Sequence, residues 1–96
     1  MNNNNLDNNK DPDHIAVFVC THVFEHTKPV LYVCRDGHEL QFLCGELHKS
    51  DELPLVVGLR HIITNDDSIS NIVNLEDGFE AERDFTGCAW KIRKIQ

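Results

Sequence analysis

The sequence predicts an α+β fold in a single domain, with a largely antiparallel sheet of about five strands and two short helices inserted before the last hairpin. Three observations lead to this class. Apolar residues alternate in strand-length runs towards both ends of the chain, an Asp-Gly pair separates two such runs in the middle, and apolar residues recur at helical spacing after Gly58. A chain of 96 residues suits one domain with one core, which we expect to span residues 14–96.

The first 13 residues are rich in asparagine and show no apolar periodicity. Such a segment cannot bury enough apolar surface to offset the entropy of ordering. We therefore expect residues 1–13 to be a disordered tail, whose deletion leaves thermal stability unchanged. The first strand is expected at residues 14–20, where β-branched and aromatic residues give two apolar faces. A strand with two apolar faces belongs in the interior of a sheet.

The segment from Pro29 to Gly45 is the strongest hairpin signal in the chain, because two apolar runs flank Asp36-Gly37. With these two residues as the loop, Arg35 faces His38 and Val33 faces Leu40. Side chains alternate across a strand, so one face becomes a core surface that carries Leu31, Val33, Leu40 and Phe42. The other face is mixed and half covered, with Val30, Tyr32, Cys34, Glu39, Gln41 and Leu43.

Two short helices are expected next. Residues 53–65 fit a helix from about Gly58, and Leu55-Val56-Val57 before it is either a strand or part of that helix. Asp66-Asp67-Ser68 supplies the N-cap of a second helix. Glu76-Asp77-Gly78 is a turn in which Gly78 takes a positive φ. The last hairpin joins residues 79–85 to residues 88–95 across Thr86-Gly87.

Charge and composition exclude some functions. The formal net charge is −7 and no long run of Lys or Arg occurs, which argues against nucleic acid as a partner. No apolar run approaches the roughly 20 residues of a membrane helix, and the N-terminus carries no apolar signal region, so we expect a cytoplasmic location and no membrane partner. The four cysteines are then expected as free thiols. An acidic protein is compatible with a basic protein partner.

The last hairpin carries an acidic face. Glu80, Glu82 and Asp84 share one face of the expected strand. This face is a solvated surface, a docking surface for a positively charged protein, or a metal site. Arg83 lies on the opposite, apolar side, where a buried guanidinium needs an acceptor, so we expect it in a structural ion pair.

Cysteine and histidine residues offer a second kind of chemistry. His22-Val-Phe-Glu25-His26 matches the string of inverted zinc proteases, but the segment before Pro29 leaves no room for the helix that this chemistry needs. Cys20 and His22 with Cys44 and His48 supply zinc-type donors, without the usual ligand spacing. A thiol-dependent enzyme would instead need one cysteine paired with a histidine in space. We expect no catalytic residues, no cofactor, no metal site and no tightly bound zinc.

Several segments resemble a family of small bacterial proteins of unknown biochemical function that is grouped with the immunity proteins of polymorphic toxin systems. They are Phe18–Val23, Pro29–Val33, Gln41–Gly45, Asp66–Ile69 and Leu75–Arg83, closing on Trp90. The Gly-aromatic-x-Ala-x-Arg string from Gly78 to Arg83 is the most specific part. The motif positions are Cys20, His22, Pro29, Phe42, Gly45, Gly78, Ala81, Arg83 and Trp90.

The resemblance implies a protein-binding module that binds and neutralises a cognate toxin. The acidic charge of the chain is compatible with a basic toxin. The resemblance brings no catalytic residues, because the motif positions are core and turn residues. The acidic residues Glu80, Glu82 and Asp84 are the expected contact residues for that partner. The alternative is a small metal-binding or thiol-dependent enzyme that uses the Cys and His residues.

Overall fold

The structure is a computed structural model that describes residues 15–46 and 53–95. The tail expected at residues 1–13 lies outside the described residues. The elements, in chain order, are β1 (Ala16–Val19), α2 (Thr21–Phe24), β2 (Tyr32–Asp36), β3 (Glu39–Leu43), β4 (Leu55–Gly58), α3 (Leu59–Asn65), the 3-10 helix η2 (Asp67–Asn71), β5 (Phe79–Glu82) and β6 (Lys91–Lys94).

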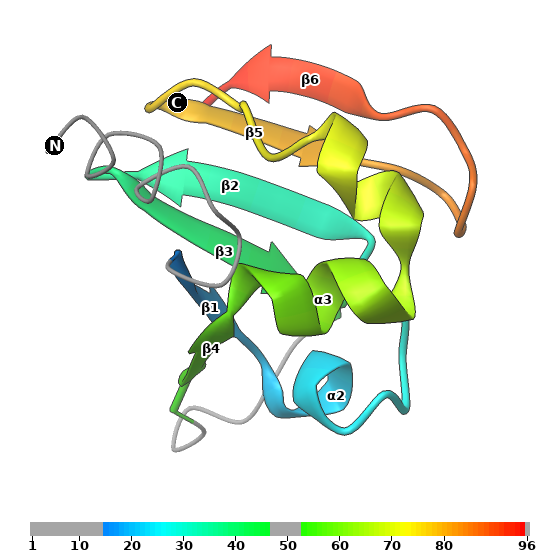
Figure 1. Cartoon of the computed structure of the whole chain (residues 1–96). Helices are drawn as coiled ribbons and strands as arrows, with labels where there is room; N and C mark the ends of the chain where they lie inside the picture. Colours follow the sequence, from blue (N-terminus) through cyan, green and yellow to red (C-terminus); the bar gives the residue numbers. More distant parts are fainter. Residues whose placement is uncertain (1–14, 47–52, 96) are drawn as a thin grey trace, which may run out of the picture.

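The strands form one six-stranded sheet in the order β4-β1-β3-β2-β5-β6 (Figure 1). The α+β class is confirmed, and β1 lies inside the sheet as expected. The sheet is mixed, because β1 pairs with β3 in parallel while the other neighbours are antiparallel. The sixth strand is β4, the segment that the sequence left open between strand and helix. It pairs with β1 along four residues, and α3 begins immediately after Gly58.

The central hairpin has its turn one residue later than expected. Asp36 pairs with Glu39, so the two-residue loop is Gly37-His38, with φ values of 66° and 73°. Both central residues therefore have the positive φ of a type I′ turn. A long-range contact holds His38 there, since its backbone N–H donates to Asp77 Oδ1 at 3.1 Å.

The later turn shifts the strand register by two residues, so Val33 faces Phe42 and not Leu40. Because an even shift preserves the faces, the expected core surface survives within the paired strands. Leu31 was also expected on this surface, but it lies before β2 begins and is only half-buried. Val33, Leu40 and Phe42 are all buried. Val30 was expected on the half-covered face but is buried in the core, since it lies before β2 begins.

One face of the sheet carries the core. Figure 1 shows α2 and α3 on the same side of the sheet. Apolar residues of α3 and of the η2 segment pack with sheet residues in one cluster, which includes Leu59, Ile62, Ile69, Ile72, Val17, Val19, Val33, Phe42 and Ala81. Asp66 caps η2 by accepting a hydrogen bond from the Ser68 backbone N–H at 3.1 Å, as the N-cap prediction requires.

The last hairpin has the register that a Thr86-Gly87 loop predicts, with Glu82 opposite Lys91. The Cys88 N–H donates to the Phe85 carbonyl at 3.0 Å, and Gly87 has a φ of 89°. The paired strands are nevertheless shorter than expected and end at Glu82 and Lys91. Beyond this point the Arg83 backbone bonds to Leu31 and the Trp90 ring lies over the Arg83 guanidinium, so the chain leaves the β5–β6 ladder.

Across the described ranges 15–46 and 53–95, no helix has the length and apolar character needed to cross a membrane.

Candidate functional sites

Arg83 is held in a structural network, as the sequence predicted. Its side chain is 0 % exposed and its guanidinium donates to Asp66 Oδ2 at 2.7 Å, to Ser68 Oγ at 2.9 Å and to the Val30 carbonyl at 3.1 Å. Burial raises the pKa of Asp66, but hydrogen bonds from Ser68 and Arg83 outweigh it and leave this pKa below the usual value. Trp90 completes the site with its ring centroid 4.3 Å from the guanidinium carbon.

The other motif positions divide into core and turn. Phe42 and Ala81 are fully buried, and Gly45 and Gly78 have φ values of 84° and 89°. Pro29 is exposed before β2. Cys20 and His22 take part in a separate cluster, described below.

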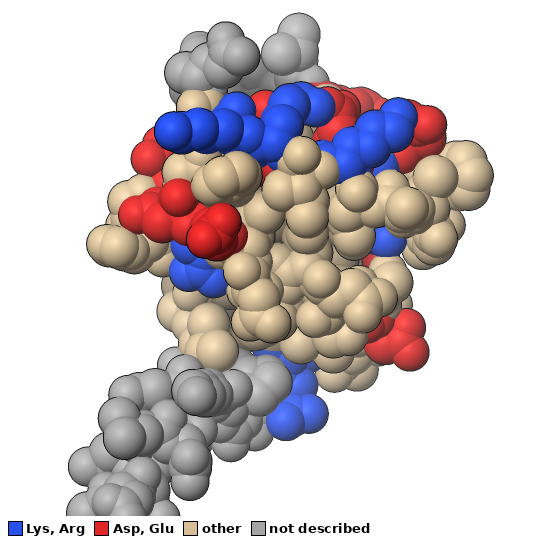
Figure 2. Space-filling model, turned by 90° about the horizontal axis from the view of Figure 1, so that it is seen from above, with Lys and Arg blue, Asp and Glu red and all other residues tan. Residues whose placement is uncertain are grey.

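The three carboxylates of the expected acidic face have different surroundings. Glu80 is only 17 % exposed and accepts hydrogen bonds from the Tyr32 hydroxyl at 2.5 Å and from Arg93 Nε at 2.6 Å. Glu82 pairs with the same Arg93, while Asp84 is 72 % exposed and lies 3.8 Å from Lys91. Figure 2 shows Lys and Arg side chains in a row beside acidic ones, viewed from above Figure 1, where β6 lies.

Glu80 is therefore part of the fold and not a free docking carboxylate. Burial and the hydrogen bond to Glu80 raise the pKa of Tyr32 well above its usual range, and bonds from Tyr32 and Arg93 lower the pKa of Glu80. The register of the Thr86-Gly87 hairpin already places Arg93 opposite Glu80, so this partner had a signal in the sequence. Tyr32 had none, because it reaches Glu80 only through the pairing of β2 with β5.

Glu82 and Asp84 instead border a groove of about 480 Å³. Its lining combines apolar side chains with acidic ones: Leu31, Tyr32, Leu43, Cys44, Gly45, Glu46, Glu82, Arg83 and Asp84. We call this surface the β2–β3–β5 groove. Glu46 was not singled out from the sequence, since it joins the other two carboxylates only through the sheet topology.

A second cluster lies where β1 and β3 end. The possible ligand atoms of Cys20, His22 and Cys44 all lie within 4.8 Å of one another, and Cys44 Sγ is 3.5 Å from His22 Nδ1. These are three of the four donors that the sequence named, and His48 lies outside the described residues. The absence of usual ligand spacing therefore does not exclude a metal site. Cys20 is the N-cap residue of α2, and His22 lies in the single turn of this helix.

The protease-like string does not form a metal-binding helix. α2 ends at Phe24, and His26 follows it with a φ of 61°. The His26 ring instead packs against that of His61, with centroids 5.3 Å apart. His22 and His26 thus do not lie one turn apart on a helical face, which agrees with the expected lack of room for a helix before Pro29.

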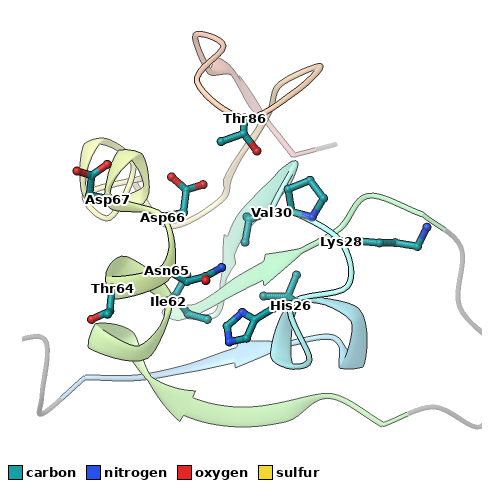
Figure 3. Close-up of a pocket in the computed structure, with 11 residues that line it drawn as sticks. His26, Lys28, Val30, Ile62, Thr64, Asn65, Asp66, Asp67 and Thr86 are labelled. Atoms are coloured by element: carbon teal, nitrogen blue, oxygen red, sulfur yellow. The ribbon is translucent and has the colours of Figure 1, made fainter.

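A cavity of about 370 Å³ lies between the α2–β2 connection, the end of α3 and the loop after β5 (Figure 3). Its polar lining includes His26, Lys28, Asp66, Asp67 and Thr86. Lys28 Nζ lies 3.0 Å from Glu46 Oε2, and Asp66 already forms an ion pair with Arg83. Among the described residues that line it, none is a cysteine, so the cavity offers no thiol–imidazole pair.

None of the four cysteines, all of which lie within the described residues, forms a disulfide bond, and Cys20, Cys34 and Cys44 are buried. Burial is the main cause that raises the pKa of the Cys44 thiol, and the neighbouring Cys20 adds to this. A hydrogen bond from the backbone of Glu46 acts in the opposite direction and favours the Cys44 thiolate.

Comparison of the chain with protein-family models, with curated proteins and with solved structures found no match.

Proposed function

We propose that the chain is a protein-binding module that recognises a positively charged protein partner through the β2–β3–β5 groove. The observation that carries this proposal is the composition of the groove, in which Leu31, Tyr32 and Leu43 are bordered by the carboxylates of Glu46, Glu82 and Asp84. A lysine or arginine side chain has an apolar stem and a cationic head, so it matches both parts of such a groove.

The carboxylates at the border already have cations of this chain beside them. Lys28 lies 3.0 Å from Glu46, Lys91 lies 3.8 Å from Asp84, and Arg93 contacts Glu82. These pairs are on the surface, where an ion pair contributes about 0–1 kcal/mol, so a partner cation can replace them at little cost. The net charge of −7 adds a long-range field that attracts a basic partner.

The resemblance described from the sequence extends the proposal to a class of partner. On that basis the partner is a cognate toxin that this protein binds and neutralises in the cytoplasm. The contact residues are then Glu82 and Asp84, and Glu80 supports the strand that carries them.

The test measures association with the protein encoded immediately upstream of this chain, since a toxin gene in that position is what the proposal expects. Wild type and the Glu82→Lys/Asp84→Lys variant are compared at low and high ionic strength. The variant should associate at least about tenfold more slowly at low ionic strength, with the difference shrinking as salt is added.

A matched control is Glu39→Lys with Glu76→Lys. Both residues are exposed and lie outside the groove, and this variant changes the net charge by the same amount. Equal slowing in both double variants would mean that only overall charge matters and would contradict the groove. Failure of the wild-type protein to bind the upstream product would contradict the neutralising role.

A further inference from the structure

We propose that Cys20, His22 and Cys44 form a zinc-binding site. The chemistry of this site is separate from the proposed partner-binding function. The proposal replaces the expectation of no bound zinc, which depended on the ligand spacing alone. The argument rests on topology, distance and donor type.

The topology brings the donors together. β1 and β3 are parallel neighbours, with Val19 opposite Phe42, so the residues that follow these strands emerge at the same edge of the sheet. Cys20 comes directly after β1 and Cys44 directly after β3. α2 begins at once after Cys20, and its single turn places the His22 imidazole next to Cys44.

The distances suit one small metal ion. A zinc ion with Zn–S bonds of about 2.3 Å and a Zn–N bond of about 2.0–2.1 Å in tetrahedral geometry separates its sulfur and nitrogen ligands by roughly 3.5 Å. Cys44 Sγ and His22 Nδ1 are 3.5 Å apart, and the ligand atoms of all three residues fall within 4.8 Å. The same calculation gives roughly 3.8 Å between two zinc-bound sulfurs, which this limit also accommodates.

The donor set and its surroundings select the metal. Two thiolates and an imidazole suit zinc and other thiophilic ions, whereas magnesium and calcium require oxygen ligands. Cys20 is 7 % and Cys44 2 % exposed, while His22 is half-buried, so the thiols are shielded and the imidazole lies on the side nearer solvent. The backbone hydrogen bond from Glu46 to Cys44 is the kind of outer contact that stabilises a metal-bound thiolate.

The experiment uses the full chain, reduced and freed of metal with a chelator that is then removed. Zinc is titrated in competition with a chromophoric chelator, and cobalt(II) is added separately as a spectroscopic probe. We expect one zinc per chain and a cobalt spectrum with thiolate-to-metal charge transfer and tetrahedral visible bands. Zinc should also raise the melting temperature of the wild-type protein.

Variants assign the ligands. Loss of an outer contact weakens metal binding about 10–100-fold. A direct ligand is lost in Cys20→Ser, Cys44→Ser and His22→Ala, so each of these variants should weaken zinc binding by more than that. Cys34→Ser and His61→Ala are the matched controls, since Cys34 is an equally buried thiol and His61 a histidine outside the cluster, and both should bind zinc as wild type does. Because the buried cysteine variants risk misfolding, His22→Ala is the decisive variant, and circular dichroism verifies its fold.

Three outcomes would overturn the proposal. The first is a reduced wild-type protein that takes up no zinc. The second is zinc binding that survives in folded His22→Ala with an unchanged cobalt spectrum. The third is a pair of thiols, Cys20 and Cys44, that oxidise to a disulfide while the reduced form shows no metal affinity, which would make the cluster a redox pair.

Discussion

At the scale of single residues, Arg83 connects the two halves of the fold. Its guanidinium joins the start of η2, through Asp66 and Ser68, to the backbone of Val30 before β2. A buried charge of this kind stabilises the protein only when all its hydrogen bonds are made, and breaking one partner leaves an uncompensated charge in the core. No buried side-chain nitrogen or oxygen among the described residues lacks a hydrogen-bond partner.

The first prediction concerns this network. Arg83→Ala should lower the free energy of unfolding by about 3–5 kcal/mol, because it leaves Asp66 without its cation and removes the group on which Trp90 packs. Urea unfolding followed by tryptophan fluorescence measures the loss. Arg93→Ala is the control, since this arginine is exposed and its loss should lower the free energy of unfolding far less than the loss of Arg83. Equal losses in the two variants would contradict the distinction between a buried and a surface pair.

The ion pair also predicts a pH dependence. The pKa of Asp66 in the folded protein lies below its usual value of 3.8, so the pair stabilises fully above about pH 4. This stability is lost as the pH falls through the folded-state pKa. The difference in unfolding free energy between wild type and Asp66→Asn should therefore be constant near neutrality and shrink below about pH 4. A difference that stays constant into acid would show that Asp66 does not titrate with folding.

At the scale of elements, turns decide how the strands pair. In the central hairpin the sequence favoured Asp36-Gly37 as the loop, yet His38 takes the second positive φ because Asp77 holds its backbone. That contact joins residues far apart in the chain, and no local pattern reveals it. Gly78 follows the same Asp77 turn, and its N–H donates to the Arg35 carbonyl at 2.7 Å.

The third prediction compares two glycines. Gly78 has a φ of 89° and Gly58 a φ of −73°, and a methyl group at either position would meet no atom within 4 Å. Gly78→Ala should therefore destabilise by about 1–2 kcal/mol through backbone strain alone. Gly58→Ala should change the free energy of unfolding by no more than about 0.5 kcal/mol. The backbone at Gly58 is unstrained, and alanine is a poorer N-cap residue but lowers the conformational entropy of the unfolded chain, so the two effects offset each other. Thermal or urea unfolding of both variants measures the contrast, and similar losses would mean that the φ of Gly78 relaxes freely.

At the scale of the whole molecule, local patterns predicted the fold class, the two hairpins and the N-cap at Asp66. They did so because alternation, turn residues and capping act within a few residues. The parallel pairing of β1 with β3 was not predictable in the same way, since it depends on how the central hairpin folds back onto β1. The candidate sites share this limit. Cys44 reaches His22 only through the pairing of β1 with β3. Glu46 joins Glu82 and Asp84 only because β2 pairs with both β3 and β5.

The last prediction follows from the unequal burial across the sheet. All four residues of β6 are exposed, and this edge strand pairs with β5 alone among the described strands, whereas β2 and β3 lie in the middle and carry the buried Val33 and Phe42. Segments with few buried apolar contacts open without global unfolding. In native-state hydrogen exchange, the bonded amides of Lys91–Lys94 should therefore exchange through local opening, while those of β2 and β3 should require global unfolding. Arg93 ties β6 to Glu80 and Glu82, so Arg93→Ala should speed exchange in β6 and leave the protection of β3 nearly unchanged. If β6 were as protected as β3, or if the variant lowered protection evenly over the sheet, the sheet would open as one unit and this prediction would be wrong.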